Sequence, residues 1–168
     1  MGENLSLPGR DAIRTPMQWN DGPAGGFSTA APQDLVRPVP TRGAFGIKKV
    51  NVQDQERDGQ SLLSWFGRAI RTLRECPEVG VGTCTVIDLP LPRSVLVHRF
   101  DAPEGAMLFL HNLADQAVTV DVGKLDGEGR PVEVFADSDY PAVTSRLKDL
   151  ELQGWGYRWI RLRRSNSN

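Results

Sequence analysis

The sequence predicts a mainly β protein, in which a small antiparallel β sandwich follows a long loop and one amphipathic α-helix. Three observations support this fold class: early prolines and glycines, one stretch of helical periodicity, and several short β-rich runs after Gly82. Such runs, separated by turn residues, are typical of a small sandwich or barrel. The runs are TCTVID (83–88), SVLVHRFD (94–101), GAMLFLHNL (105–113), QAVTVDV (116–122), PVEVFA (131–136) and GYRWIRLR (156–163).

The segment from Met1 to Gly59 is predicted to be a long loop. It holds six prolines and eight glycines and hardly any periodic apolar pattern. Compact domains rarely contain structureless loops beyond about 12–15 residues unless the loop is functional or disordered. Because the segment also contains Trp19, Phe27 and Phe45, a solvated tail is disfavoured. A binding loop is therefore expected.

An amphipathic helix is predicted after Asp58. Arginines occupy the face opposite the apolar positions, as on the solvent side of a surface helix. Asp58 or Ser61 can cap its N-terminus, and Pro77 is expected to end it. The apolar positions are Leu62, Phe66, Ala69, Ile70 and Leu73. This face needs a partner surface.

Composition places the chain among ordinary globular proteins. It has 168 residues, 39% of them apolar and 24% charged, with a net charge of −1. This balance offers no field that favours nucleic acid or an anionic membrane as a partner. No apolar run approaches the roughly 18 residues of a membrane span, and the start lacks a signal-peptide pattern. A cytoplasmic protein is therefore expected.

Neither cysteine nor histidine spacing predicts a metal site. Cys76 and Cys84 lie eight residues apart, which is not a zinc spacing. We interpret them as reduced, small apolar residues, with a disulfide between them as the alternative. His98 and His111 lie inside β runs without a third ligand. No metal and no cofactor are expected.

Several motifs together carry a family resemblance. They are GRDAIRTPMQW (9–19), GGFS (25–28), VNVQDQ (50–55) and the closing LELQGWGYRWIRL (150–162). With them the chain resembles the C-terminal part of α-amylase superfamily glycoside hydrolases (glycoside hydrolase family 13), most of all the trehalose synthase and α-glucosidase branches. The β region matches more loosely, through HNLADQ (111–116) and DSDYPA (137–142).

The resemblance implies a division of the chain. Residues 1–78 would supply the last loop and last helix of an incomplete (β/α)8 barrel, 79–164 the C-terminal antiparallel β domain, and 165–168 a disordered tail. A complete barrel needs about 250 residues. The catalytic Asp, Glu and Asp of the family lie on earlier barrel strands, so the resemblance implies that this chain holds no catalytic residue and is inactive alone.

Arg14 is the expected substrate-binding residue. The resemblance implies that the arginine of RTPMQW helps to hold the terminal glucose of an α-glucoside such as maltose or trehalose. A guanidinium suits that task because it presents several fixed donors. The alternative is an ion pair with Asp11 or Asp21 that pins the loop. Ala24 departs from the family pattern, which often has asparagine there.

The last β run suggests a second sugar contact. Trp155, Tyr157 and Trp159 alternate, so they are expected to share one face of the strand, either stacking on a sugar or packing between the β domain and the barrel. Arg158, with Arg161, Arg163 and Arg164, is interpreted as part of a solvated strand. Asp137 and Asp139 are interpreted as turn residues rather than a catalytic pair.

The functional hypothesis is a C-terminal fragment of an enzyme that hydrolyses α-glucosides or interconverts maltose and trehalose by the retaining mechanism. Its partners would be the α-glucoside, bound through the full enzyme, and the missing barrel. One alternative is a stand-alone carbohydrate-binding domain that uses the Trp155, Tyr157 and Trp159 face. The other is an accessory domain that forms a homo-oligomer through the apolar face of the 58–76 helix.

Overall fold

The structure is a computed structural model that describes residues 9–125, 129–144 and 146–164. The expected tail at 165–168 lies outside the described residues. The chain forms two compact units, Met1–Arg68 and Ala69–Asn168, so the boundary falls inside a helix. No helix among the described residues has the length and apolar character needed to cross a membrane.

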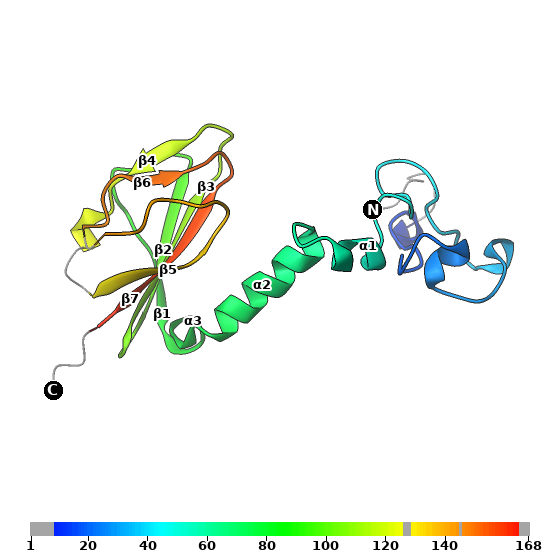
Figure 1. The fold of residues 1–168 in the computed structure, drawn as a ribbon, viewed down its shortest axis with the longest axis horizontal. Coiled ribbons are helices and arrows are strands. Elements are labelled where there is room, and N and C mark those ends of the chain that lie inside the picture. Colours follow the sequence, from blue (N-terminus) through cyan, green and yellow to red (C-terminus); the bar gives the residue numbers. More distant parts are fainter. Residues whose placement is uncertain (1–8, 126–128, 145, 165–168) are drawn as a thin grey trace. The chain divides into compact units, whose positions relative to one another are not determined.

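The first unit is built from loops held by short helices. Three 3-10 helices span Gly9–Ala12, Pro23–Gly26 and Pro32–Asp34, and helix α1 spans Val52–Arg57. The sequence analysis did not predict α1, whose six residues are too few to show a helical period. Figure 1 shows α1 directly before the longer helix α2.

Helix α2 spans Leu62–Arg74, and Ser61, one of the two predicted cap residues, directly precedes it. The Ser61 hydroxyl accepts a hydrogen bond from the amide of Ser64 at 3.1 Å, which satisfies one of the free donors of the first turn. The helix ends at Arg74, before Pro77, in agreement with our expectation. Pro77 also starts the short helix α3 (Pro77–Val81), because proline is favoured in the first helical turn, where its missing N–H costs nothing.

The apolar face of α2 is solvent-exposed in this chain. Leu62 is 65% exposed, Phe66 50% and Ile70 52%. Helices in proteins gain most of their stability by packing such a face against a partner surface. Of the predicted apolar positions, Ala69 is buried and Leu73 half-buried, whereas the described residues leave these three largely uncovered.

The second unit contains two antiparallel sheets, which confirms the predicted mainly β fold. The larger sheet has the strand order β1-β2-β3-β7-β5, and β4 pairs with β6 in a smaller sheet (Figure 1). The strands are β1 (Thr83–Val86), β2 (Val95–Ala102), β3 (Gly105–Asn112), β4 (Val118–Val120), β5 (Arg130–Ala136), β6 (Leu150–Leu152) and β7 (Tyr157–Arg163). Strand β6 was not predicted, since three residues carry little alternation.

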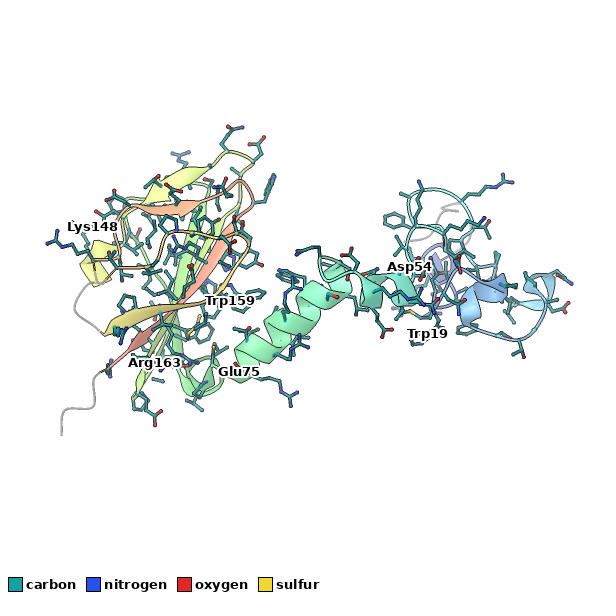
Figure 2. The ribbon with its side chains drawn as sticks, viewed as in Figure 1. Trp19, Asp54, Glu75, Lys148, Trp159 and Arg163 are labelled. Atoms are coloured by element: carbon teal, nitrogen blue, oxygen red, sulfur yellow. The ribbon has the colours of Figure 1, made fainter. Side chains whose placement is uncertain are left out.

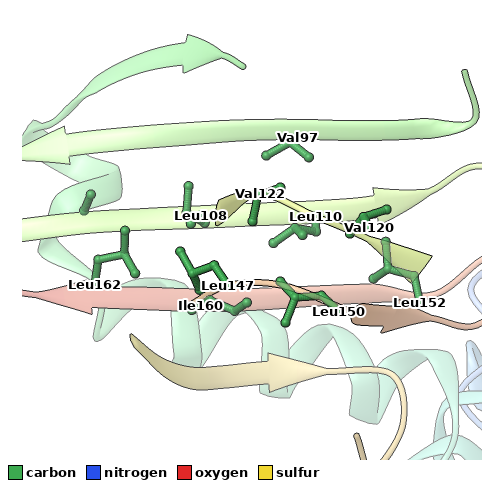
Figure 3. Packing of buried hydrophobic residues seen from close by; sticks show 11 residues of the cluster. Val97, Leu108, Leu110, Val120, Val122, Leu147, Leu150, Leu152, Ile160 and Leu162 are labelled. Carbon is green, nitrogen blue, oxygen red and sulfur yellow. The ribbon is translucent and has the colours of Figure 1, made fainter. Parts of the chain in front are cut away.

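The hydrophobic core lies between the two sheets. Leu108 and Leu110 of β3 are fully buried, and so is Leu152 of β6 (Figure 3). Because side chains alternate between the faces of a strand, every second residue of β3 and β7 reaches this core. The cluster comprises Val97, Ala106, Leu108, Leu110, Val120, Val122, Leu147, Leu150, Leu152, Ile160 and Leu162.

The opposite face of the larger sheet carries aromatic side chains. The rings of Phe109 and Trp159, on neighbouring strands, lie 5.1 Å apart, and those of Phe135 and Trp159 4.7 Å apart. Aromatic pairs at these separations add about 0.5–1.5 kcal/mol beyond their burial. The face comprises His98, Phe100, Phe109, His111, Phe135, Tyr157 and Trp159.

Candidate functional site

The RTPMQW stretch is fixed to the N-terminus of α1 by its own backbone. The carbonyl of Gln18 accepts a hydrogen bond from the amide of Val52 at 2.9 Å, and that of Trp19 accepts one from Gln53 at 3.0 Å. Figure 2 shows Trp19 and Asp54 around this helix. These contacts satisfy two of the N–H groups that the first turn of a helix leaves free.

The Gln18 side chain adds a second attachment. Its amide donates to the carbonyl of Phe45 at 3.0 Å and to that of Val50 at 2.6 Å. One side chain therefore ties the motif to two points of the loop about thirty residues later. This role accounts for the irregular sequence of the motif. Its hydrogen bonds go to the backbone of a distant loop, so the motif needs neither the period of a helix nor the alternation of a strand.

Asn51 caps α1 from a buried position. Only 2% of this residue is exposed. Its side-chain oxygen accepts from the Asp54 amide at 2.9 Å, and its side-chain nitrogen donates to the Ile47 carbonyl at 2.8 Å. A buried amide with both ends satisfied stabilises one local arrangement. Asn51 therefore joins the loop to the helix cap, next to Val50 and Val52, which are hydrogen-bonded to Gln18. The sequence pattern did not reveal this role.

The GGFS segment folds back on the motif through left-handed backbone. Ala24 has φ 54° and Gly25 has φ 62°, and the Gly25 carbonyl accepts from the Trp19 amide at 2.8 Å. Gly26 has φ 67°, and a β-carbon there would lie 2.5 Å from the side-chain nitrogen of Asn20, so another residue would be strained and would displace the Asn20 side chain. Ala24 occupies a conformation that asparagine adopts far more readily than alanine.

Arg14 lies on the rim of a pocket in the first unit. The pocket has a volume of about 420 Å³ and is lined mainly by apolar atoms. Arg14 is exposed. Within the described part of the chain it makes no hydrogen bond or ion pair, including with Asp21; the Asp11 side chain lies outside that part. The lining residues are Arg14, Thr15, Pro16, Phe27, Ser28, Ala30, Asp34, Leu35, Val36 and Arg37.

The three aromatic residues near the C-terminus do not share a face, contrary to our expectation. Tyr157 and Trp159 lie on β7 with ring centroids 6.2 Å apart, and Trp159 is only 7% exposed. Trp155 precedes the strand in a turn, with φ 59° and 68% exposure. A left-handed residue breaks the alternation of a strand, which is why the sequence pattern failed here.

Arg158 was wrongly interpreted as part of a solvated strand. It is 1% exposed, and its guanidinium pairs with Glu133 and donates to the carbonyl of Pro141 at 3.1 Å. Arg161 is also largely buried and pairs with Glu78 at 3.0 Å. Arg163 and Arg164 are exposed as predicted.

Asp137 has a structural environment. Its carboxylate accepts a hydrogen bond from the Tyr140 hydroxyl at 2.9 Å and one from the Tyr157 amide at 2.6 Å. The Tyr140 hydroxyl in turn accepts from the Gln153 amide at 3.0 Å. Burial raises the pKa of Tyr140 to about 12. The interpretation of this segment as a hydrogen-bonded turn agrees with these contacts.

The two histidines stack rather than chelate. Their rings are 5.5 Å apart and nearly parallel, and burial lowers the pKa of each. Among residues 9–125, 129–144 and 146–164, no group of three or more His, Cys, Asp or Glu side chains could hold a metal ion.

Both cysteines are free thiols. Cys76 is buried, and its thiol donates to the carbonyl of Thr72 at 3.0 Å. Desolvation raises the pKa of the Cys76 thiol. A buried thiol of this kind behaves as a small apolar residue.

The fold and the motif loop together define a class. A mainly β domain preceded by a helix and an anchored RTPMQW loop corresponds to the C-terminal part of family 13 glycoside hydrolases. Residues 105–161 match the family described as sucrose hydrolase-like, C-terminal domain. The match extends from the start of β3 into β7 and so includes strands of both sheets.

Within this class the chain is homologous to the C-terminal regions of trehalose synthases. It is 34% identical to trehalose synthase of Pimelobacter sp. over 96% of its length, and 31% identical to trehalose synthase/amylase TreS of Mycolicibacterium smegmatis over 97%. It spans 29% of the length of each. A crystal structure of trehalulose synthase MutB is similar in fold, with a TM-score of 0.71 and 24% identity, over 91% of this chain and 26% of that one.

Proposed function

We propose that this chain is part of an enzyme that acts on α-glucosides, either by hydrolysis or by interconverting maltose and trehalose, and that Arg14 contacts the substrate. The observation that carries the proposal is the position of Arg14. Its loop is anchored at several backbone points, while its guanidinium lines a pocket and has no partner among the described residues. The homology to trehalose synthases selects the class of substrate.

A charged side chain on a fixed loop is suited to binding. A guanidinium carries a positive charge and presents planar donors that match pairs of sugar hydroxyls. Anchoring the loop in advance lowers the entropy cost of positioning it around a ligand. Thr15 and Pro16 shape the backbone beside it, since proline fixes its own φ and biases the preceding residue toward an extended conformation.

We also propose that residues 1–78 complete a (β/α)8 barrel. The rest of that barrel would correspond to the part of the trehalose synthases that this chain does not match. The exposed apolar face of α2 supports this, because it is the surface that a neighbouring barrel helix would cover. Retaining glycoside chemistry needs two carboxyl groups about 5–5.5 Å apart. In this proposal that pair comes from the barrel, and the chain by itself is inactive. The cytoplasmic location and the homo-oligomer remain predictions.

The test is a chimeric enzyme, in which this chain replaces the matching C-terminal region of the Pimelobacter trehalose synthase. The chimera is expected to convert maltose to trehalose or to release glucose, while the chain alone does neither above a buffer control. In the chimera, Arg14→Ala should lower kcat/KM at least a hundredfold, because a charged donor to the bound sugar is lost. Arg42→Ala, at another exposed arginine of the same unit, is the matched control.

Two results would contradict the proposal. Activity of the isolated chain on maltose would show that the barrel is not needed. An active chimera that is equally impaired by Arg14→Ala and Arg42→Ala would show that the position of Arg14 has no particular role.

A further inference from the structure

Trp155 combines two features that rarely occur together, a left-handed backbone and a largely exposed aromatic side chain. Its φ is 59° and it is 68% exposed. The described residues include three other non-glycine residues with positive φ, Ala24, Leu147 and Asp149. Ala24 and Leu147 are buried, and aspartate tolerates this conformation. Trp155 is neither buried nor of a residue type that tolerates this conformation.

The left-handed backbone of Trp155 destabilises the fold, and its exposed side chain gains little from burial in exchange. A non-glycine residue is disfavoured in the left-handed region, because its β-carbon approaches the following carbonyl oxygen too closely. Glycine would avoid this cost, and Gly154 and Gly156 flank the position. A bulky side chain retained at such a site points to a role outside the fold itself.

The turn that carries Trp155 is held rigidly. The Trp155 amide donates to the carbonyl of Ala114 at 2.7 Å. Asn112, which is 2% exposed, donates through its side chain to the carbonyl of Gln116 at 2.7 Å and to that of Gln153 at 2.9 Å. One buried amide thus joins the 113–116 turn to the 153–156 turn, and the backbone that carries the indole is fixed.

The two joined turns carry exposed polar residues as well as Trp155. Asp115, Gln116 and Gln153 are all exposed on the two joined turns. A β-carbon on Gly154 would lie 2.0 Å from the carbonyl oxygen of Asp115, so the turns touch directly. Leu113 is exposed beside them. An exposed indole on turns that also carry exposed carboxylate and amide side chains offers the two kinds of contact that a sugar needs, since its C–H groups stack on an aromatic face while its hydroxyls form hydrogen bonds.

We propose that Trp155 is the platform of a sugar-binding site in the β domain, on which a glucose ring of an α-linked gluco-oligosaccharide stacks. Asp115 and Gln116 accept or donate hydrogen bonds at its edge. The site belongs to the second unit and is separate from the Arg14 loop. The choice of an α-linked ligand rests on the proposed function, whereas the stacking platform does not.

The site differs from the three-residue face that the sequence suggested. Trp159 is buried, and Tyr157 stacks on Phe135 with ring centroids 5.4 Å apart. Neither ring offers a free flat face of the kind that Trp155 presents. A single aromatic contact of this type predicts weak binding with a fast exchange rate, which suits NMR and calorimetry.

The experiment titrates maltoheptaose into the 168-residue chain and follows the tryptophan indole N–H signals by NMR, with the affinity measured by calorimetry. One indole signal should shift with saturation, and Trp155→Gly should remove that signal and weaken binding at least tenfold. Trp155→Phe should retain most of the binding. Val81→Ser, at another exposed apolar residue of the same unit, should bind as the parent does.

Trp155→Gly separates a binding role from a structural one, because glycine prefers the left-handed conformation. The variant should keep or raise the denaturation midpoint while it loses binding. The proposal is overturned if the parent chain does not bind maltoheptaose, or if Trp155→Gly binds it equally well. It is also overturned if Arg14→Ala rather than Trp155→Gly removes binding, which would place the sugar at the first unit. Since no catalysis is measured, failure here leaves the proposed function standing.

Discussion

The guanidinium of Arg158 pairs with the carboxylate of Glu133 at two points inside the β sandwich, Nε to Oε1 at 2.5 Å and Nη2 to Oε2 at 3.1 Å. The Arg158 side chain is 2% exposed and that of Glu133 23%. The guanidinium carbon also lies 4.5 Å from the centre of the Tyr140 ring. The buried charge is thus neutralised and hydrogen-bonded on several sides.

Removing one partner of this pair should destabilise the fold. Glu133→Gln is expected to lower the free energy of unfolding by about 2–3 kcal/mol, because it leaves the Arg158 charge uncompensated. The loss is not larger because Glu133 is partly exposed. Urea denaturation of both forms measures the change. The double variant Glu133→Leu with Arg158→Met should lose less than Glu133→Gln alone. A larger loss in the double variant would show that the charges themselves are not the cause.

Asn51 should control the order of the motif loop. Asn51→Ala removes the cap of α1 and the bond to Ile47, and we expect a loss of about 2–3 kcal/mol in the local stability of the first unit. Hydrogen exchange of the Val52 and Gln53 amides reports that stability directly. Asn51→Asp keeps the acceptor, but it loses the donor to Ile47 and places a second carboxylate against that of Asp54. Because two like charges in contact at a buried site are unfavourable, it should destabilise the unit at least as much as Asn51→Ala. Unchanged exchange rates in Asn51→Ala would refute the capping role.

Ala24→Gly should stabilise the first unit. The residue has φ 54°, where alanine is strained and glycine is not, so a gain of about 0.5–1 kcal/mol is expected. The measurement is the midpoint of urea denaturation followed by Trp19 fluorescence. Gly25→Ala, at φ 62°, is the opposite change and should destabilise. If both substitutions lower the midpoint, side-chain packing rather than backbone conformation decides at this position.

The stacked histidines predict acid sensitivity of the β domain. Burial lowers the pKa of His98, and burial together with the His98 charge lowers the pKa of His111. Their neutral forms are favoured in the folded state, so this contribution to stability is present above the usual pKa of about 6.5 and is lost as the pH falls below it. Denaturation midpoints between pH 5 and pH 8 measure the slope. His98→Phe, which can keep the stacking on Phe109, should flatten it; an unchanged slope would assign the effect to other groups.

Local patterns were reliable where the structure is local. The period of α2 was predicted, and Ser61 was one of the two predicted caps, because helix bonds and capping bonds connect residues three or four positions apart. The β runs and the mainly β class followed from alternation and turn residues. The alternation of β7 also contained a signal that we did not use. It places Arg158 on the same face as Ile160 and Leu162, which marks that arginine as buried.

Long-range contacts explain what the sequence did not reveal. Helix α1 exists because Gln18 and Trp19 supply acceptors from more than thirty residues away, and no local pattern encodes such a partner. Strand β6 is three residues long and is defined by its pairing with β4. Trp155 left the expected alternation because its amide is bonded to Ala114 in a turn some forty residues earlier.

The sequence by itself determined the fold class and the family resemblance, and it singled out Arg14 as the candidate substrate-binding residue. Periodicity and a short motif are properties of neighbouring residues, so the sequence alone reveals them. Only the tertiary structure decided which side chains are exposed and which are held. It buried Arg158, separated Trp155 from Tyr157 and Trp159, and made Asn51 the anchor of the motif loop. The physical reason is that exposure and hydrogen-bond partnership depend on residues distant in the chain, whose positions are fixed only when the core is packed.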